Sequence, residues 1–304
     1  LKMDSKNVSK MVTIQEGCDK FCSFCVVPFT RGAEYSRSIE QINAEVINLS
    51  KSGVKEVTLL GQNVSSYSSK IFAEKRDKKV GISFLLRVLS KIKDIKRLRY
   101  ITSHPNDIED DLICEHKCNT KVMPFLHLPI QSGSNKILKD MNRKHTREFY
   151  IDLINKIRFH VPEIAFSSDF IVGYPGENKS DFEMTLDLVD KVNFASSYSF
   201  KYSPRPGTKS SLIKSNISDE IVALRLKKLQ EVLNVQQREF NEKFIGKTVE
   251  ILIDSRGKKD CQFSGRTPHL QPVHVFSKRN IIGELMMVKI ESLTSYSFHG
   301  KILN

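Results

Sequence analysis

Short apolar runs alternate with amphipathic stretches over the first two thirds of the chain. The apolar runs are nearly continuous, which is typical of parallel strands covered on both faces. They predict six strands, at Val12–Gln15, Val57–Leu60, Arg99–Thr102, Phe125–Leu128, Ala165–Val172 and Ser197–Tyr202. Because six strand–helix units are too few for a closed eight-stranded barrel, we expect an α/β fold with an open, partial (β/α)6 barrel of the TIM-like type.

Capping signals mark the helices between these strands. Ser38 with Gln41 predicts the start of a helix over Ile39–Ser52, since a capping hydroxyl followed three residues later by Glu or Gln is a helix-start signal. Ser180 with Glu183 predicts the same kind of start for a later helix.

The pattern changes near Lys247, after a long amphipathic helix over about Ser218–Phe244. Apolar and polar residues then alternate, as in strands with one buried face. The strands predicted here begin with the alternating Val249, Ile251 and Ile253 and continue with Gln262–Arg266, Val273–Phe276 and Leu285–Ser292. Such closely spaced short strands predict a small all-β barrel of the oligonucleotide-binding (OB-like) kind. We expect a core domain over residues 1–238 and the small barrel over residues 239–304.

The net charge of the chain indicates which class of partner it could bind. The 304-residue chain has a formal net charge of +13, and the segment from Lys247 onward carries nine Lys and Arg against five acids. This surplus favours a polyanionic partner, because neutralising phosphates releases counterions. A lysine-rich composition with solvated basic faces is the alternative explanation. Rings interleaved with the basic residues of the predicted barrel suit stacking on RNA bases, although some must belong to its core; they are Phe263, His269, His274, Phe276 and His299.

Three cysteines near the start of the chain carry the clearest chemical signal. Cys18, Cys22 and Cys25 follow a CxxxCxxC spacing, and thiolates this close on one loop can bind three irons of a cubane iron–sulfur cluster. One iron then stays open for a small molecule, as in a catalytic metal site, which predicts an enzyme. The alternative is a zinc site whose fourth ligand comes from a second run, with the candidates Cys114, His116 and Cys118.

Other properties narrow the class of protein. No apolar run approaches membrane-spanning length, and no signal peptide precedes the cysteines. Six cysteines are too few for a disulfide framework in a chain of this length. We therefore expect a cytoplasmic protein without a membrane partner, and we expect it to be a monomer.

Polar, glycine-containing segments follow the predicted strands directly. Because the carboxyl ends of the strands meet on one face of such a barrel, these segments predict a single ligand site. They cover residues 61–63, 103–105, 131–134, 173–177 and 203–208. Asp169 lies inside an apolar strand, and a buried carboxylate is costly unless it is paired. We therefore expect Asp169 to contact a ligand or a polar network.

These features together resemble the radical S-adenosylmethionine (SAM) methylthiotransferases. The chain is most similar to the bacterial MiaB type, which makes 2-methylthio-isopentenyladenosine in tRNA. Cys18, Cys22 and Cys25 match the family's cysteine triplet, and matching stretches cover residues 26–32, 60–64, 102–105, 127–134, 169–177 and 202–208. The predicted small barrel resembles the family's RNA-binding TRAM domain, including residues 264–267.

The resemblance implies the cofactors, the substrate and a radical mechanism. The cysteine triplet would hold a [4Fe-4S] cluster whose open iron binds SAM, and electron transfer would cleave SAM to a deoxyadenosyl radical. Gln62, Ser132 and Asp169 are assigned to the bound SAM from their positions at strand ends. The radical would act on an adenine beside the anticodon, in the anticodon stem-loop of tRNA. The electron donor would be a protein such as a flavodoxin or a ferredoxin.

One departure from the family limits what the resemblance implies. Family members carry an N-terminal domain with three cysteines for a second cluster, whereas seventeen residues precede Cys18 here. We therefore expect a chain that lacks this domain, cleaves SAM, and does not complete methylthiolation alone. The alternatives are a methylthiotransferase for threonylcarbamoyladenosine in tRNA or for a ribosomal protein, and a non-catalytic RNA-binding remnant.

Overall fold

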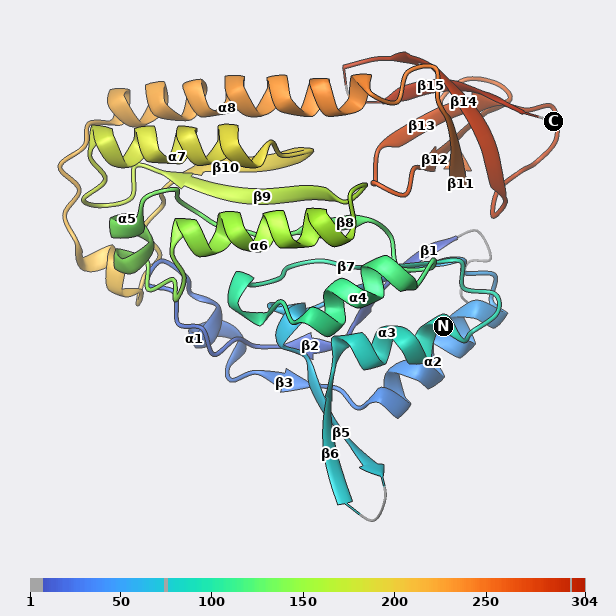
Figure 1. Cartoon of the computed structure of the whole chain (residues 1–304), viewed down its shortest axis with the longest axis horizontal. Helices are drawn as coiled ribbons and strands as arrows, with labels where there is room; N and C mark the ends of the chain where they lie inside the picture. Colours follow the sequence, from blue (N-terminus) through green and yellow to red (C-terminus); the bar gives the residue numbers. More distant parts are fainter. Residues whose placement is uncertain (1–7, 74–75, 296, 304) are drawn as a thin grey trace.

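Six parallel strands form the centre of the larger part of the molecule (Figure 1). The computed structural model describes residues 8–73, 76–295 and 297–303. One sheet has the order β1–β4–β7 and the other β8–β9–β10, and a parallel bridge between Leu98 and Val122 joins them. Within the described residues β1 and β10 do not pair, so the barrel is open as predicted. The strands are β1 (Ser9–Thr13), β4 (Glu56–Leu60), β7 (Arg97–Tyr100), β8 (Phe125–His127), β9 (Ala165–Val172) and β10 (Ser196–Lys201).

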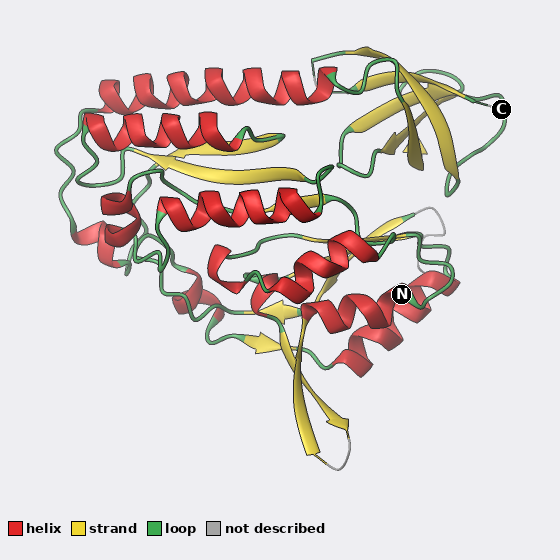
Figure 2. Ribbon diagram, in the orientation of Figure 1, coloured by secondary structure: helices red, strands yellow, loops and turns green. Residues whose placement is uncertain are grey.

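Helices cover one face of these strands (Figure 2), and neighbouring helices in the series α2, α3, α4, α6, α7 and α8 contact one another. The amide of Gln41 donates to the Ser38 hydroxyl at 3.3 Å, which confirms the predicted start of α2. The helices are α1 (Val27–Arg31), α2 (Ile39–Lys51), α3 (Ile82–Ser90), α4 (Asp110–Cys118), α5 (Asn135–Asp140), α6 (Arg147–His160), α7 (Lys179–Val192) and α8 (Asp219–Glu242). Short 3-10 turns are η1 (Val64–Ser66), η2 (Pro105–Asp107) and η3 (Lys209–Leu212). No helix in the described part of the chain has the length and apolar character needed to cross a membrane.

The predicted start of α7 at Ser180 and Glu183 is wrong. Asn178 caps this helix and accepts from the amide of Asp181, while the Asp181 carboxylate accepts from the amide of Asn178, both at 2.9 Å. This reciprocal pair satisfies two amides that the helix leaves free. Asp181 is buried and also accepts from the Ser134 hydroxyl at 2.6 Å, so the loop after β8 fixes the cap two residues earlier than expected.

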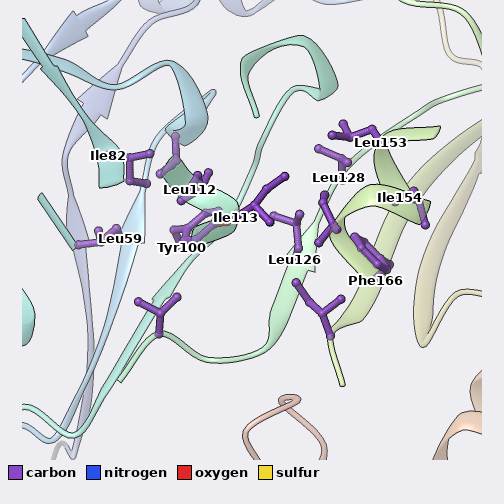
Figure 3. Packing of buried hydrophobic residues seen from close by; sticks show 14 of the residues in the cluster. Leu59, Ile82, Tyr100, Leu112, Ile113, Leu126, Leu128, Leu153, Ile154 and Phe166 are labelled. Carbon is purple, nitrogen blue, oxygen red and sulfur yellow. The ribbon is translucent and has the colours of Figure 1, made fainter. Parts of the chain in front are cut away.

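A continuous apolar core lies between the strands and the helices (Figure 3). Strand residues Leu59, Leu126 and Phe166 pack there against helix residues, which include Ile82, Leu112 and Ile154. Burying side chains of this size contributes about 1.5–3 kcal/mol each relative to exposure. The strand ends are thereby held in fixed positions, which a site built from several loops requires.

The small barrel has its own core of buried residues, among them Ile251, Phe263 and Phe298. Its strands close in the order β11–β12–β13–β15–β14, which confirms the expected small all-β barrel. The strands are β11 (Thr248–Arg256), β12 (Gln262–Arg266), β13 (Pro272–Phe276), β14 (Leu285–Leu293) and β15 (Phe298–Ile302). Helix α8 runs without a break across the expected domain boundary at residue 238, and the division into residues 1–238 and 239–304 stays a prediction.

Two buried arginines of β7 join the small barrel to the large sheet. Arg97 and Arg99 are 1% and 4% exposed and donate to main-chain carbonyls of the small barrel at 2.7–2.9 Å. The accepting carbonyls belong to Glu250, Arg266, Thr267 and Pro268. β7 runs from this contact toward the loops at its carboxyl end, so the small barrel sits at the opposite end of the strand from those loops.

Two further antiparallel pairs were not predicted. β2 (Gln15–Glu16) pairs with β3 (Tyr35–Ser36), and β5 (Ser68–Ala73) pairs with β6 (Arg76–Gly81). The β5–β6 hairpin projects away from the rest of the molecule (Figure 1).

Candidate functional site

The cysteine loop lies between β2 and α1. Cys18, Cys22 and Cys25 are free and half-buried, and the amide of Cys25 donates to the carbonyl of Cys22 at 3.0 Å. Gly17 opens the loop at φ +71°, and a Cβ there would lie 2.1 Å from the carbonyl oxygen of Ala33. Only glycine fits such an approach in a left-handed conformation. The sequence Glu-Gly-Cys thus turns the chain sharply where the first cysteine begins.

The loop is anchored to the carboxyl ends of several strands. The Ser23 hydroxyl donates to the carbonyl of Asp140 at 2.7 Å and lies 2.9 Å from the Tyr174 hydroxyl. The carbonyl of Ser23 accepts from both the amide and the hydroxyl of Ser210 at 3.0 and 2.9 Å. Tyr202, at the end of β10, donates to the Ser210 hydroxyl at 2.9 Å. Residues distant in sequence therefore hold the cysteines in place.

The loops after β4 and β7 complete the same rim. Asn63 donates to the Asp107 carboxylate at 2.6 Å, and Lys20 of the cysteine loop pairs with this carboxylate at 2.7 Å. Asn106 donates to the carbonyl of Lys144, which follows α5, at 2.8 Å. These contacts bring the segment after β4 and the turn after β7 to the cysteine loop, as predicted for these two strand ends.

Arg143 lies beside the thiols, and no pattern in the sequence pointed to it. Its Nη1 is 3.7 Å from the sulfur of Cys22, and its Nη2 donates to the carbonyl of Pro129 at 2.5 Å. Among the described residues, its buried Nε has no hydrogen-bond partner, and neither does the Ser103 hydroxyl or Nε2 of His145. Buried polar atoms are normally paired, so this rim presents unused donors and acceptors beside three thiols.

Two histidines on this rim are held neutral. The rings of His104 and His145 lie 5.6 Å apart. Burial, and after it the charge of Arg143, lower the pKa of His104 to about 2 and that of His145 to about 4. Near pH 7 both rings are uncharged, so each presents one acceptor nitrogen and one donor nitrogen.

The thiols are also affected by burial. Burial raises the pKa of Cys18 and of Cys25, and the Arg143 charge opposes this rise at Cys25. Within the described residues, no three His, Cys, Asp or Glu side chains converge as ligands of a single metal ion. In a cubane cluster each thiolate binds a different iron, so a cluster requires wider spacing. The assignment of Cys18, Cys22 and Cys25 to a cluster stays a prediction.

The three residues assigned to SAM have different surroundings. Gln62 is half-buried, and its side chain makes no hydrogen bond within the described residues. Ser132 is 1% exposed, and its hydroxyl accepts from the amide of Ser134 and lies 3.4 Å from that of Thr185. Asp169 has 28% of its side chain exposed. Gln62 and Asp169 are thus accessible to a ligand, whereas Ser132 joins its loop to α7. Contact with SAM stays a prediction for all three.

Asp169 faces a small polar cluster on the inner side of the barrel. Its Oδ2 lies 3.4 Å from Nε2 of His127 on β8, whose Nδ1 lies 3.0 Å from the Ser167 hydroxyl. Tyr198 is opposite Asp169 in the β9–β10 register, is 62% exposed, and lies edge-to-face to His127 at 6.5 Å. Asp169 therefore lies in a polar network with His127 and Ser167, as one of the two roles predicted for it requires.

The residues considered for zinc do not form a site. His116 is buried in α4, where its Nε2 lies 2.7 Å from the Tyr100 hydroxyl. Cys114 and Cys118 are exposed on this helix with sulfurs 3.7 Å apart. Their surroundings therefore offer no fourth ligand directed at the cysteine loop.

The small barrel separates its rings into core and surface. Phe263 is buried in the barrel core, and His269 is turned toward the large domain, where its Nε2 lies 2.8 Å from the carbonyl of Glu163. Phe276 is 55% exposed, and the half-buried rings of His274 and His299 lie 5.8 Å apart on adjacent strands. The rings of His274, Phe276 and His299 are therefore the ones that a ligand can reach.

The fold and the site define a class of protein, an open (β/α)6 barrel with a three-cysteine loop at the carboxyl edge of its strands. The family model of the Radical SAM superfamily matches residues 12–189. The chain therefore belongs to the radical SAM superfamily.

Curated relatives are similar over almost the whole chain. One is a tRNA-2-methylthio-N(6)-dimethylallyladenosine synthase of Orientia tsutsugamushi (strain Boryong), 50% identical over 99% of this chain. Another of the same name from Rickettsia felis is 49% identical over 98% of this chain. The chain spans 66% of the length of each relative. These similarities confirm the resemblance inferred from the motifs.

Solved structures share the fold at low sequence identity. Coproporphyrinogen III oxidase of Escherichia coli, described as a radical SAM enzyme, has a TM-score of 0.58 and 14% identity. The match covers 88% of this chain and 68% of that one. The radical SAM methyltransferase TsrM of Kitasatospora setae has a TM-score of 0.54 and 14% identity, over 68% of this chain and 39% of that one. At this identity the similarity establishes the fold alone.

Proposed function

We propose that this chain acts in methylthiolation of isopentenyladenosine in tRNA, with a [4Fe-4S] cluster on Cys18, Cys22 and Cys25 and SAM beside it. The observation that carries the proposal is the cysteine loop at the strand ends, with a guanidinium nitrogen 3.7 Å from the Cys22 sulfur. The names of relatives at 50% identity support the reaction and the substrate. A cytoplasmic setting suits a half-exposed cluster, which a reducing compartment preserves.

The residues present at the rim fit this cofactor pair. The three thiols supply the cluster ligands, and the cluster, when bound, supplies the electron that cleaves SAM. Arg143 places a positive charge beside a negatively charged set of thiolates, which favours their deprotonated form. The unpaired Nε of Arg143, the Ser103 hydroxyl and Nε2 of His145 offer hydrogen bonds to a polar ligand. The side chains of Gln62 and Asp169 are accessible and can form hydrogen bonds with the polar groups of SAM.

The inner face of the barrel suits the target base. His127 and Asp169 form a donor–acceptor pair there, and the exposed ring of Tyr198 offers a surface for stacking. A base must leave its stack before an enzyme can act on a ring carbon, and an aromatic surface lowers the cost of that step.

We further propose that the small barrel is a TRAM domain that binds the tRNA. Its surface carries the accessible rings of His274, Phe276 and His299, and the exposed Lys278 lies two residues after Phe276. The next residue, Arg279, is also exposed and pairs with Glu284. Rings beside basic side chains suit stacking and phosphate contact in single-stranded RNA. The anticodon stem-loop is the predicted ligand. An electron donor such as a flavodoxin or a ferredoxin, and the monomeric state, remain predictions.

The test is reductive SAM cleavage after anaerobic reconstitution with iron and sulfide. We expect deoxyadenosine from the wild-type chain, none from Cys22→Ala, and an RNA affinity that changes less than about twofold in that variant. Cys261→Ala is the matched control, since Cys261 is an exposed cysteine of the small barrel. Absence of deoxyadenosine from a wild-type chain that holds a full cluster would favour the non-catalytic remnant. Loss of RNA binding in Cys22→Ala would make the cysteines structural.

A further inference from the structure

We propose that the β5–β6 hairpin and three exposed rings near the cysteine loop form one docking face for an RNA loop. The face consists of Lys78 and Lys79 on β6 with Phe21, Phe29 and Tyr35, and we refer to it as the hairpin face. This inference rests on the proposed function and adds a second RNA contact at the opposite end of the barrel from the small domain.

The hairpin is rooted on the rim of the candidate site. It begins one residue after η1, and the amide of Ser68 donates to the Ser36 hydroxyl at 3.2 Å. The Ser66 hydroxyl donates to the Glu34 carboxylate at 2.8 Å, and the Tyr67 hydroxyl donates to the carbonyl of Arg37 at 2.7 Å. The root is therefore fixed to the segment that follows the cysteine loop and α1.

The hairpin is basic and has little packing of its own. Residues 68–81 contain five Lys and Arg against two acids. Lys78 and Lys79 are exposed, and neighbouring residues of a strand point to opposite faces, so positive charge lies on both sides of the ribbon. Only Ile71 and Val80 are packed against the core among the described hairpin residues. Basic side chains on both faces of a ribbon suit contact with the phosphates of a single-stranded RNA segment.

Exposed rings extend the same face toward the cysteines. Phe21 is 55% exposed, Phe29 is 65% exposed, and their rings meet edge-to-face at 6.4 Å. Tyr35 is 62% exposed and directly precedes Ser36, which anchors the hairpin. Exposing three large rings beside a positively charged ribbon is costly for solubility, but it suits bases that are splayed out of a loop.

A polar pocket of about 400 Å³ lies at the foot of the hairpin, between β6 and the loop after β7. Its lining includes the side chains of Ser66, Ser68, Lys79, Asn106 and Asp107. Its size is within the usual range for small-ligand pockets. Hydroxyl, amide and carboxylate groups suit the hydroxyls of a ribose, whereas Asp107 and Glu109 disfavour a phosphate inside the pocket. The pocket therefore continues the hairpin face toward the rim as a site for a sugar.

The experiment measures binding of the full chain to a synthetic anticodon stem-loop RNA by fluorescence anisotropy, over 50–200 mM salt. Lys78→Glu/Lys79→Glu is compared with Lys227→Glu/Lys228→Glu, an exposed adjacent pair on α8 with the same change in charge. We expect the hairpin variant to bind the RNA roughly tenfold more weakly. The slope of log K against log salt concentration should become about 1.4 less steep, because each phosphate contact to a single strand contributes about 0.7 to this slope. The α8 variant should change the affinity less than about threefold.

A second pair of variants tests stacking without changing charge. Tyr35→Ala should weaken binding about 5- to 100-fold, the range for losing one stacked base. Phe159→Ala, which removes an 82% exposed ring from α6, should leave the affinity unchanged. Far-UV circular dichroism and the urea midpoint of each variant establish that it is folded.

The outcomes separate this inference from the proposed function. If the hairpin variants bind RNA as well as their controls do, the hairpin face does not contact the RNA and this inference is wrong. The proposed function still holds in that case, provided that the wild-type chain binds the RNA and cleaves SAM. If the wild-type chain does not bind the RNA at all, both fail. If the hairpin variants lose affinity equally for a fully paired RNA of the same length, the face binds duplex and the proposal of a loop contact is overturned.

Discussion

The contact between Arg99 and Glu56 makes a quantitative prediction about how the small barrel is held. The guanidinium Nε donates to the Glu56 carboxylate at 2.9 Å, and both side chains are less than 5% exposed. Its two other nitrogens donate to the carbonyls of Pro268 and Thr267 at 2.7 and 2.9 Å. Burial lowers the pKa of Arg99 to about 10, so the group is charged at pH 7. One side chain therefore joins β4, β7 and the small barrel.

Arg99→Met removes this charge and leaves the Glu56 carboxylate buried and unpaired. Breaking one side of a buried pair costs about 3–5 kcal/mol, and each carbonyl left without a donor adds about 1–3 kcal/mol unless water reaches it. We expect a loss of at least about 3–5 kcal/mol in the free energy of unfolding, which is the value if water reaches both carbonyls. Adding Glu56→Leu removes the unpaired carboxylate, so the double variant should be more stable than Arg99→Met alone.

The assay is a double-mutant cycle from urea unfolding, followed by circular dichroism and tyrosine fluorescence because the chain has no tryptophan. We expect a coupling energy of at least about 2 kcal/mol between the two positions. The control is Arg238→Met, since Arg238 is exposed on α8 and pairs with Glu242 of the same helix. It should change stability by less than about 1 kcal/mol. Additive effects of Arg99→Met and Glu56→Leu would refute the buried pair.

Three further predictions concern the site and its surroundings. Arg143→Met should lower the iron retained per chain after reconstitution several-fold while Arg143→Lys retains most of it, because a charge stabilises the thiolates; equal iron content in both variants would contradict this. Cys114→Ser/Cys118→Ser should leave iron content unchanged, and a loss would revive the alternative metal site. Burial lowers the pKa of His116 to about 4. Between pH 6.5 and 4 this side chain is therefore protonated in the unfolded chain and neutral in the folded chain. Stability should fall as pH drops from 6.5 to 4, by up to about 3 kcal/mol from this residue. His116→Gln should remove this share of the fall in the urea midpoint and leave the share that His104 and His145 contribute.

The sequence was most informative where the chemistry is local. The spacing of Cys18, Cys22 and Cys25 and the polar segments after the strands are adjacent along the chain, and the barrel topology brings strand ends together without further information. Arg143 and Tyr198 could not be found this way. Each lies in a stretch without a distinctive pattern, and each reaches the site only because separate strand–helix units close around it. The partners of Asp169 likewise come from β8 and β10.

The errors had physical causes. Ser180 and Glu183 satisfy the capping rule, but Asn178 and Asp181 satisfy it too, and Asp181 gains a second hydrogen bond from the buried loop after β8. The β5–β6 hairpin was missed because apolar and basic residues face one another across it, as Ile71 and Lys78 do, so no alternating pattern appears. Patterns reveal strands that bury a face, and this ribbon buries very little.

Buried polar groups have different parts at the two ends of the large barrel. At the small-domain end, the terminal guanidinium nitrogens of Arg97 and Arg99 donate to carbonyls of the small barrel and fix one domain on the other, while Nε of Arg97 and Nδ1 of His269 have no partner among the described residues. At the cysteine end, Arg143, Ser103 and His145 each keep a buried polar atom without a partner among the described residues. Each such atom costs about 1–3 kcal/mol, and a ligand that pairs with them recovers that cost on binding. The contacts at the small-domain end therefore hold the small barrel at a set distance from a rim whose polar atoms a ligand can satisfy, as the proposed binding of one RNA at two places would require.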